Sequence, residues 1–245
     1  MKTDQEMTIE LYVGPTPNGQ KVAILLEELA LPYRCHEIDI LRGDQLTPEF
    51  LRINPNNKQP AIIDPDGPGG EPITLWESCA ILVYLAEKKQ QFLPADTAER
   101  AHMMKWLFFQ ASTQGPMSGQ YAHFAFYAAP EHQYPYAAER YLNEMNRQMG
   151  ILDRHLAEQD FMLSDYSIAD MALLPYAITS LNRSTVQRPH MKAWIDRLKE
   201  RPAVRRGLAI MQDAIRKETI AGGLEGYGEE HRDILFGSKQ FSERT

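Results

Sequence analysis

The kind of secondary structure that this sequence predicts changes abruptly near residue 90. Before that point, short runs rich in β-branched and aromatic residues alternate with stretches whose apolar residues recur every three or four positions. The runs that predict strands are TIELYVG, YRCHEIDI, QPAIIDP and PITLWE, and the stretches that predict helices are residues 19–30, TPEFLRIN and ESCAILVYLAEKK. The predicted order is therefore strand, helix, strand, helix, two strands and a final helix.

A strand–helix–strand unit followed by a hairpin and a helix is the thioredoxin-like arrangement. The polar connection QQFLPADTAER follows it, and each later segment with a regular apolar period predicts a helix. We therefore expect an α/β thioredoxin-like domain at residues 1–90, an all-helical bundle domain at residues 98–220, and a Gly-rich, charged tail at residues 221–245.

Charge and composition limit the classes of function. The net charge of −7 argues against a general nucleic-acid binder, because such proteins need a surplus of lysine and arginine. No stretch approaches the roughly 18 apolar residues of a membrane span, and the first residues lack the apolar core of a signal peptide. The only cysteines are Cys35 and Cys79, which favours a reducing compartment. We expect a cytoplasmic protein with no nucleic-acid or membrane partner, and both cysteines buried as small apolar side chains.

The entrance of the first predicted helix carries the segment GPTPNGQK. Thr16 and Asn18 are residue types that cap helices by accepting hydrogen bonds from first-turn N–H groups. Those N–H groups, with the positive end of the helix dipole, also make a helix start a binding site for anions. A threonine hydroxyl and an asparagine amide can donate to a thiolate and so lower the thiol pKa. From these residues alone, capping and anion binding both stay open.

Two further segments stand at strand boundaries. Gln59–Pro60 precedes the third predicted strand, where a cis bond in a thioredoxin-like domain exposes the Gln59 backbone to an extended peptide. Glu77–Ser78 joins the last strand to a helix, where Ser78 is either a helix cap or, with first-turn N–H groups, a site for a carboxylate. In the second interpretation Glu77 pairs with an ammonium group, so the two residues recognise the zwitterionic end of an amino acid.

The segment GPMSGQYAHFAFYAAPEHQYPY concentrates aromatic residues after a Gly–Pro break in a long predicted helix. Such aromatic segments more often belong to a hydrophobic core or a protein interface than to a ligand-binding site. Because this one lies beside the expected cleft, we predict that Tyr121, His123 and Phe124 line a pocket for a second substrate. The histidines lack the spacing of metal ligands, so no metal is predicted.

Together these motifs resemble the cytosolic glutathione transferases over nearly the whole chain. The ES pair before a helix, the X–Pro bond before the third strand and the later SIAD, a capping box of Ser167 and Asp170, occur at the family's spacing. The segments PTPNGQKVAILLEEL, PEFLRINPNNKQPAIID, GPMSGQYAHF and YAAERYLNEMNRQ are most similar to the bacterial nu class, relatives of the yeast nitrogen-regulatory prion protein. The resemblance implies a homodimer of thioredoxin-like and helical-bundle subunits that uses glutathione as a substrate.

The resemblance also implies roles for individual residues. Catalysis would rest on Thr16 and Asn18, beside the glutathione sulfur. The residues implied to bind glutathione are Gln45 and Lys58 at its glycyl end, the backbone of Gln59 with Pro60 at its cysteinyl unit, Glu77 and Ser78 at its γ-glutamyl group, and Arg140 from the helical domain. Arg140 would reach in from the partner subunit or toward a second glutathione. Gln59 departs from the family, which usually has an apolar residue such as Ile or Val there.

The implied activity is glutathione-dependent reduction of disulfides, with weak peroxidase activity and poor conjugation. The start of the first helix has neither the cysteine nor the serine that other classes place there, so bound glutathione supplies the thiolate. Tyr12 on the first strand is the alternative side chain. A conventional transferase that conjugates glutathione to electrophiles and a non-enzymatic regulatory module stay open as alternatives.

Overall fold

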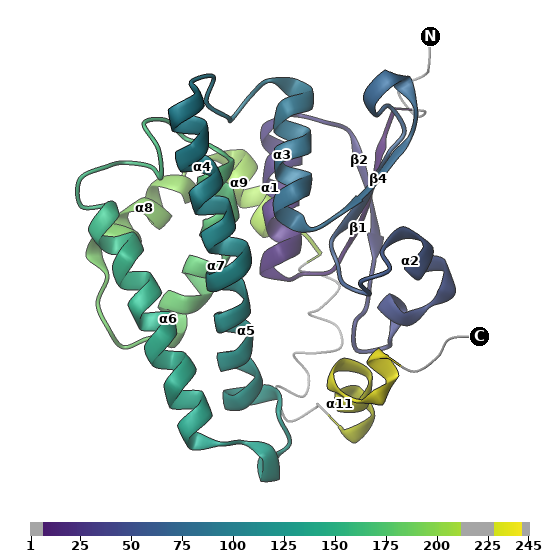
Figure 1. The fold of residues 1–245 in the computed structure, drawn as a ribbon, viewed down its shortest axis with the longest axis vertical. Coiled ribbons are helices and arrows are strands. Elements are labelled where there is room, and N and C mark those ends of the chain that lie inside the picture. Colours follow the sequence, from purple (N-terminus) through teal and green to yellow (C-terminus); the bar gives the residue numbers. More distant parts are fainter. Residues whose placement is uncertain (1–6, 212–227, 242–245) are drawn as a thin grey trace.

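The computed structural model describes residues 7–211 and 228–241. Figure 1 shows a twisted sheet on one side of the molecule and a larger group of helices on the other. Helices α1 (Pro17–Glu28) and α3 (Ser78–Lys89) lie between them and contact α7 of the helical group. Helix α2 (Pro48–Ile53) contacts strands β3 and β4 from the other face of the sheet.

The sheet has the strand order β2-β1-β3-β4. The strands are β1 (Ile9–Val13), β2 (Tyr33–Glu37), β3 (Ala61–Asp64) and β4 (Ile73–Trp76). β1 and β2 are parallel because α1 forms the crossover between them, whereas β3 runs antiparallel to β1 and β4. In the register of the central strand, Leu11 lies opposite Cys35 of β2 and Ile62 of β3. This topology is the thioredoxin-like arrangement that the element order predicts.

Helix α1 packs on the sheet through an apolar face. Leu25 and Leu26 of α1 are fully buried, as are Leu11 and Val13 of β1. Burying such a side chain contributes roughly 1.5–3 kcal/mol. Gly19 allows the close approach of helix to strand, because a Cβ there would lie 2.5 Å from Val13 Cγ2. These contacts fix the N-terminus of α1 against the end of β1.

The helical domain is centred on α7 (Ile168–Arg183), most of whose residues are buried. Around it lie α4 (Thr97–Phe109), α5 (Gly115–Ala122), α6 (Pro135–His155), α8 (Pro189–Lys199) and α9 (Pro202–Leu208). Ser167 and Asp170 form the predicted capping box, and Asp170 Oδ1 also accepts a 2.9 Å hydrogen bond from the indole N–H of Trp194. The predicted fold class is confirmed, whereas the predicted domain boundaries stay a prediction. None of the described helices has the length and apolar character needed to cross a membrane.

Two π-helical turns flank α5 in the described chain. Gln110–Gln114 joins α4 to α5, and His123–Tyr127 follows α5. A π turn shifts the side chains that follow it around the helix, and such turns are frequent at functional sites. The first turn begins at Gln110, which is 1% exposed and faces the start of α1.

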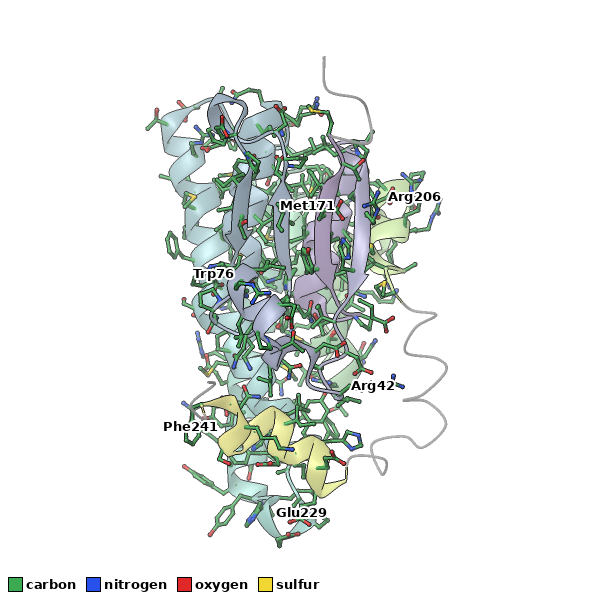
Figure 2. The ribbon with its side chains drawn as sticks, turned by 90° about the vertical axis from the view of Figure 1, so that its right-hand side faces the viewer. Arg42, Trp76, Met171, Arg206, Glu229 and Phe241 are labelled. Carbon is green, nitrogen blue, oxygen red and sulfur yellow. The ribbon has the colours of Figure 1, made fainter. Side chains whose placement is uncertain are left out.

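A C-terminal segment returns to the sheet domain. It consists of α11 (Glu229–Phe236) and the 3₁₀ turn Ser238–Gln240. Figure 2 shows it crossing below the sheet, with Glu229 and Phe241 near its two ends. The sequence predicted only a tail over residues 221–245, of which 221–227 and 242–245 lie outside the described residues.

This segment contacts both domains. The Phe236 ring lies 4.5 Å from that of His123, between ring centroids, on the helical side. On the sheet side, the backbone carbonyl of Gln240 accepts a 3.2 Å hydrogen bond from Asn57 Nδ2. Ile234 is buried, next to Gly43.

The prediction that both cysteines are buried is wrong for Cys35, and Cys79 is only half-buried. Cys35 was expected to be buried, but it is exposed. It lies on β2, which is the edge strand of the sheet and is mostly exposed or half-buried along its length. A sequence pattern that predicts a strand does not show whether the strand lies in the centre of the sheet or at its edge. The burial of a side chain on that strand therefore does not follow from the pattern.

Candidate functional site

A cavity of about 250 Å³ lies where the starts of α1 and α3 meet the π turn before α5 and the middle of α7. Its lining residues are Asn18, Lys21, Glu77, Ser78, Gln110, Ala111, Gly115, Pro116 and Tyr176. Two helices therefore begin at one cavity, each with first-turn N–H groups that lack partners within the helix. The positive ends of both helix dipoles favour an anion in this position.

Thr16 and Gln59 fix the entrance of α1. Thr16 is the N-cap of the helix, and its Oγ1 accepts hydrogen bonds from the Gly19 N–H, at 3.3 Å, and from Gln59 Nε2. Gln59 Oε1 accepts a 3.2 Å hydrogen bond from the buried Gly14 N–H. Both acceptor positions of the Thr16 hydroxyl are thus occupied. Its proton, which donates to no described residue, is free for a ligand.

Asn18 does not cap the helix, so the capping interpretation is wrong for this residue. Asn18 lies inside the first turn of α1, and its Oδ1 accepts a 2.7 Å hydrogen bond from Lys21 Nζ. Burial raises the pKa of the Tyr176 hydroxyl to about 12, although the nearby amide of Asn18 acts to lower it. Because its oxygen is held by the lysine, Asn18 presents its NH₂ group to the cavity side.

Lys21 is 1% exposed, which is rare for a lysine. Besides Asn18, its ammonium donates to Ser78 Oγ at 3.2 Å and to Gln110 Oε1 at 2.5 Å. Burial lowers the pKa of Lys21 to about 8, although the negative charge of Glu77 acts to raise it.

The Glu77–Ser78 pair lies at the start of α3. Glu77 occupies the N-cap position without a side-chain cap bond, and Ser78 is the first helical residue, so the prediction of Ser78 as a cap is wrong. Glu77 has a φ of +71°, a conformation that costs of order 1–3 kcal/mol in a residue other than glycine. Its side chain is exposed, whereas Ser78 is buried. Such strain clusters at ligand-binding sites.

The residues predicted for the glycyl end of glutathione lie elsewhere in the sheet domain. Gln45 is buried and donates a 3.1 Å hydrogen bond to the Ile40 carbonyl, and its Oε1 has no partner among the described residues. Lys58 is exposed, with Nζ 3.4 Å from Gln240 Oε1 of the C-terminal segment. The Gln59–Pro60 bond is cis, as predicted.

The predicted residues of the helical domain do not line the cavity of about 250 Å³. Tyr121 is buried against Phe126, with ring centroids 5.6 Å apart. His123 lies between Phe124 and Phe236. Their predicted role in a second-substrate pocket stays a prediction.

Arg140 and Tyr12 also lie away from this cavity. Arg140 is exposed on α6, where its charge acts on the nearby Glu144. Its predicted role at a partner subunit stays a prediction. The Tyr12 ring stacks on that of His36 at 4.6 Å, which favours the packing role over the catalytic one.

Neither cysteine has the environment of a nucleophile. Burial raises the pKa of the Cys79 thiol, and its Sγ lies 3.4 Å from Gln110 Oε1. The pKa of the exposed Cys35 thiol is also raised, because neighbouring atoms shield it in part from water and the negative charge of Glu27 lies nearby. Both thiols are therefore protonated at neutral pH, and a thiol attacks disulfides only as the thiolate. Across the ranges that the structure describes, no group of three or more His, Cys, Asp and Glu residues is placed to hold a metal ion.

Sequence reasoning missed Lys21, Gln110 and Tyr176. A signal existed for Lys21, which lies one turn before Leu25 on the apolar face of α1. Gln110 ends the apolar run WLFF, but nothing in the sequence shows that a π turn directs it toward α1. Tyr176 lies among the buried residues of α7 and carries no motif.

Comparisons with known proteins agree with this geometry. A family model described as "Glutathione S-transferase, N-terminal domain" matches residues 16–88. The disulfide-bond oxidoreductase YfcG of Escherichia coli is 46% identical over 208 residues, which cover 83% of this chain and 96% of that protein.

Two solved structures are also similar. A glutathione transferase from Pseudomonas putida, with one glutathione disulfide bound per subunit, is 44% identical with a TM-score of 0.79, over 83% of this chain and 92% of that one. A glutathione transferase from Burkholderia graminis, with two glutathione molecules bound per subunit, is 42% identical with a TM-score of 0.80, over 83% of this chain and 88% of that one.

Proposed function

Because the chain belongs to the glutathione S-transferase family, we propose that it is a glutathione-dependent disulfide-bond reductase. The observation that carries the proposal is the cavity between two helix starts, which offers the donors of an anion site but no cysteine at the start of α1. The name of the similar oxidoreductase from E. coli and the glutathione disulfide in the similar P. putida structure support it.

Glutathione would bind with its sulfur at the start of α1. The free hydroxyl proton of Thr16 and the amide of Asn18 would donate to the thiolate, which lowers its pKa. Ser78 and the first-turn N–H groups of α3 would hold the γ-glutamyl carboxylate, and Glu77 its ammonium group. Gln45 and Lys58 would contact the glycyl end, and the backbone of Gln59, with the adjacent Pro60, would pair with the cysteinyl unit.

The reaction consists of two thiol–disulfide exchanges. The bound thiolate attacks one sulfur of the substrate disulfide, forms a mixed disulfide with it, and releases the other sulfur as a thiolate that takes a proton from water. A second glutathione thiolate attacks the glutathione sulfur of the mixed disulfide and releases the second substrate thiol. Two glutathione thiols are oxidised to one glutathione disulfide, and two electrons reduce the substrate. The rate follows the fraction of attacking thiolate.

We also propose a homodimer in a reducing compartment such as the cytoplasm. The compartment is supported by the two free cysteines and by the use of reduced glutathione. In the dimer, Arg140 would face the partner's site or a second glutathione.

The test combines calorimetry with a double variant. We expect two reduced glutathione molecules, or one tightly bound glutathione disulfide, per subunit. The variant Cys35→Ser/Cys79→Ser should keep full activity toward a hydroxyethyl disulfide, because neither thiol takes part. Loss of activity in this variant would overturn the mechanism. One reduced glutathione without affinity for the disulfide, with turnover of an aromatic halide, would instead indicate a conjugating transferase. No binding of either form would leave a regulatory module.

A further inference from the structure

The ammonium of Lys21 has all its hydrogen-bonding capacity used inside the protein. A lysine ammonium has three donors and no acceptor. Its three acceptors here are Asn18 Oδ1 at 2.7 Å, Ser78 Oγ at 3.2 Å and Gln110 Oε1 at 2.5 Å. They come from α1, α3 and the π turn after α4, so one side chain joins three of the elements that line the cavity.

Because the Lys21 ammonium only donates hydrogen bonds, each neighbouring side chain must turn an oxygen toward it. An amide whose oxygen faces the ammonium turns its NH₂ group away from it. In Asn18 that group faces the hydroxyl of Tyr176. In Gln110 the buried Nε2 has no partner among the described residues and lies 3.2 Å from the position of a Cβ on Gly115, which lines the cavity. The hydroxyl of Ser78, which accepts from Lys21, keeps its own proton to donate.

A buried amide donor without a partner is destabilising. Gln110 Nε2 is such a donor, buried in the cavity wall beside Gly115.

We propose that Lys21 is the positioning residue of the glutathione site: its ammonium orients Asn18 to donate to the thiolate and Ser78 to donate to the γ-glutamyl carboxylate, it holds Gln110 in the cavity wall, and it is the buried positive charge beside both anions. This inference rests on the proposed function. It assigns to Lys21 no bond to the sulfur and no proton transfer, only orientation and charge.

The surroundings of Lys21 make the protonation of its ammonium sensitive to a bound ligand. The charge of Glu77 acts on it from the N-cap of α3, the Cys79 thiol shares the acceptor Gln110 Oε1 with it, and the Tyr176 ring of α7 lies 5.1 Å from Nζ. Burial lowers its pKa to about 8 despite these neighbours. An anion bound in the cavity favours the charged form, so binding should raise the pKa of Lys21, typically by about one unit or more for a charge within 4–6 Å.

The first experiment compares Lys21→Met with Lys89→Met in the full chain. Methionine keeps the length of the side chain and removes the ammonium, and Lys89 is an exposed lysine on α3. The pKa of bound glutathione is read from the ultraviolet absorbance of its thiolate. In Lys21→Met we expect this pKa to return toward that of free glutathione by about one unit or more, and kcat/KM for the disulfide to fall about tenfold or more. Lys89→Met should match the unsubstituted protein.

A second measurement does not depend on the folding of a variant. The unsubstituted protein, labelled with ¹³C at the lysine Cε positions, is titrated by NMR with and without S-methylglutathione, which has no thiol. One lysine should titrate near pH 8, and its midpoint should rise when the ligand is bound. An unchanged thiol pKa in Lys21→Met, or a lysine midpoint that the ligand does not move, would overturn the inference and leave the proposed function standing. If the unsubstituted protein binds no form of glutathione, the proposed function itself fails and the inference fails with it.

Discussion

The side chain of Gln59 connects two elements of the sheet domain. Its amide joins the Gly14 N–H to the Thr16 hydroxyl and so connects the end of β1 to the cap of α1. The substitution Gln59→Met keeps the length of the side chain and removes both hydrogen bonds. We therefore expect it to destabilise the protein and to loosen Thr16.

The magnitude follows from the two bonds. The Gly14 N–H is buried and donates to no other described group, so losing its bond to Gln59 Oε1 costs about 1–3 kcal/mol. Thr16 keeps its bond from the Gly19 N–H, so the second loss is at the low end of about 0.5–1.5 kcal/mol. The methionine side chain regains part of this by apolar burial. A net loss of about 2 kcal/mol is expected, which lowers Tm by about 4–8 °C for a chain of this size.

The assay is urea unfolding at fixed pH, with the stability change taken from the midpoint at unchanged slope. The control is Gln120→Met, because Gln120 is exposed on α5. The same variants are assayed for disulfide reduction, where Gln59→Met should lose activity because the Thr16 hydroxyl is free to turn. If Gln59→Met is as stable as Gln120→Met, the reasoning about Gln59 is refuted.

Two other predictions concern the rest of the molecule. Asp64 is fully buried and accepts hydrogen bonds from Lys88 Nζ at 2.7 Å and from the Tyr84 hydroxyl at 2.6 Å. Although burial acts to raise its pKa, these bonds lower it below the usual value. The ionised Asp64 therefore contributes to stability above about pH 4, which is its pKa in the unfolded chain, and this contribution is lost as the pH falls toward its pKa in the folded protein. Urea midpoints should show this loss of stability in acid, and the loss should be smaller in Asp64→Asn. Phe236→Ala removes the ring contact with His123, which is worth about 1 kcal/mol, so hydrogen exchange in α11 should quicken while global stability changes little. Unchanged protection of α11 would show that Phe236 does not anchor it.

The sequence by itself determined the order of the elements and the local chemistry at their ends. Strand and helix periods differ, so the change near residue 90 can be read without a structure. Thr16, Asn18 and the Glu77–Ser78 pair were also found, because each stands at a predicted helix start where free N–H groups need partners. These signals lie within a few neighbouring residues, and short-range chemistry is what a sequence displays.

The tertiary structure alone decided which polar groups meet. Lys21 contacts residues 57 and 89 positions away, Ser78 and Gln110, and an isolated lysine in a sequence does not show whether it will be buried. The same holds for Gln59, whose amide reaches back 43 positions to Thr16. The sequence also did not show whether Ser78 caps the helix or begins it: in the structure the non-helical N-cap is Glu77, with a positive φ, and the helix begins at Ser78. These contacts depend on the packing of segments that are far apart in the sequence, and a local sequence pattern does not predict that packing.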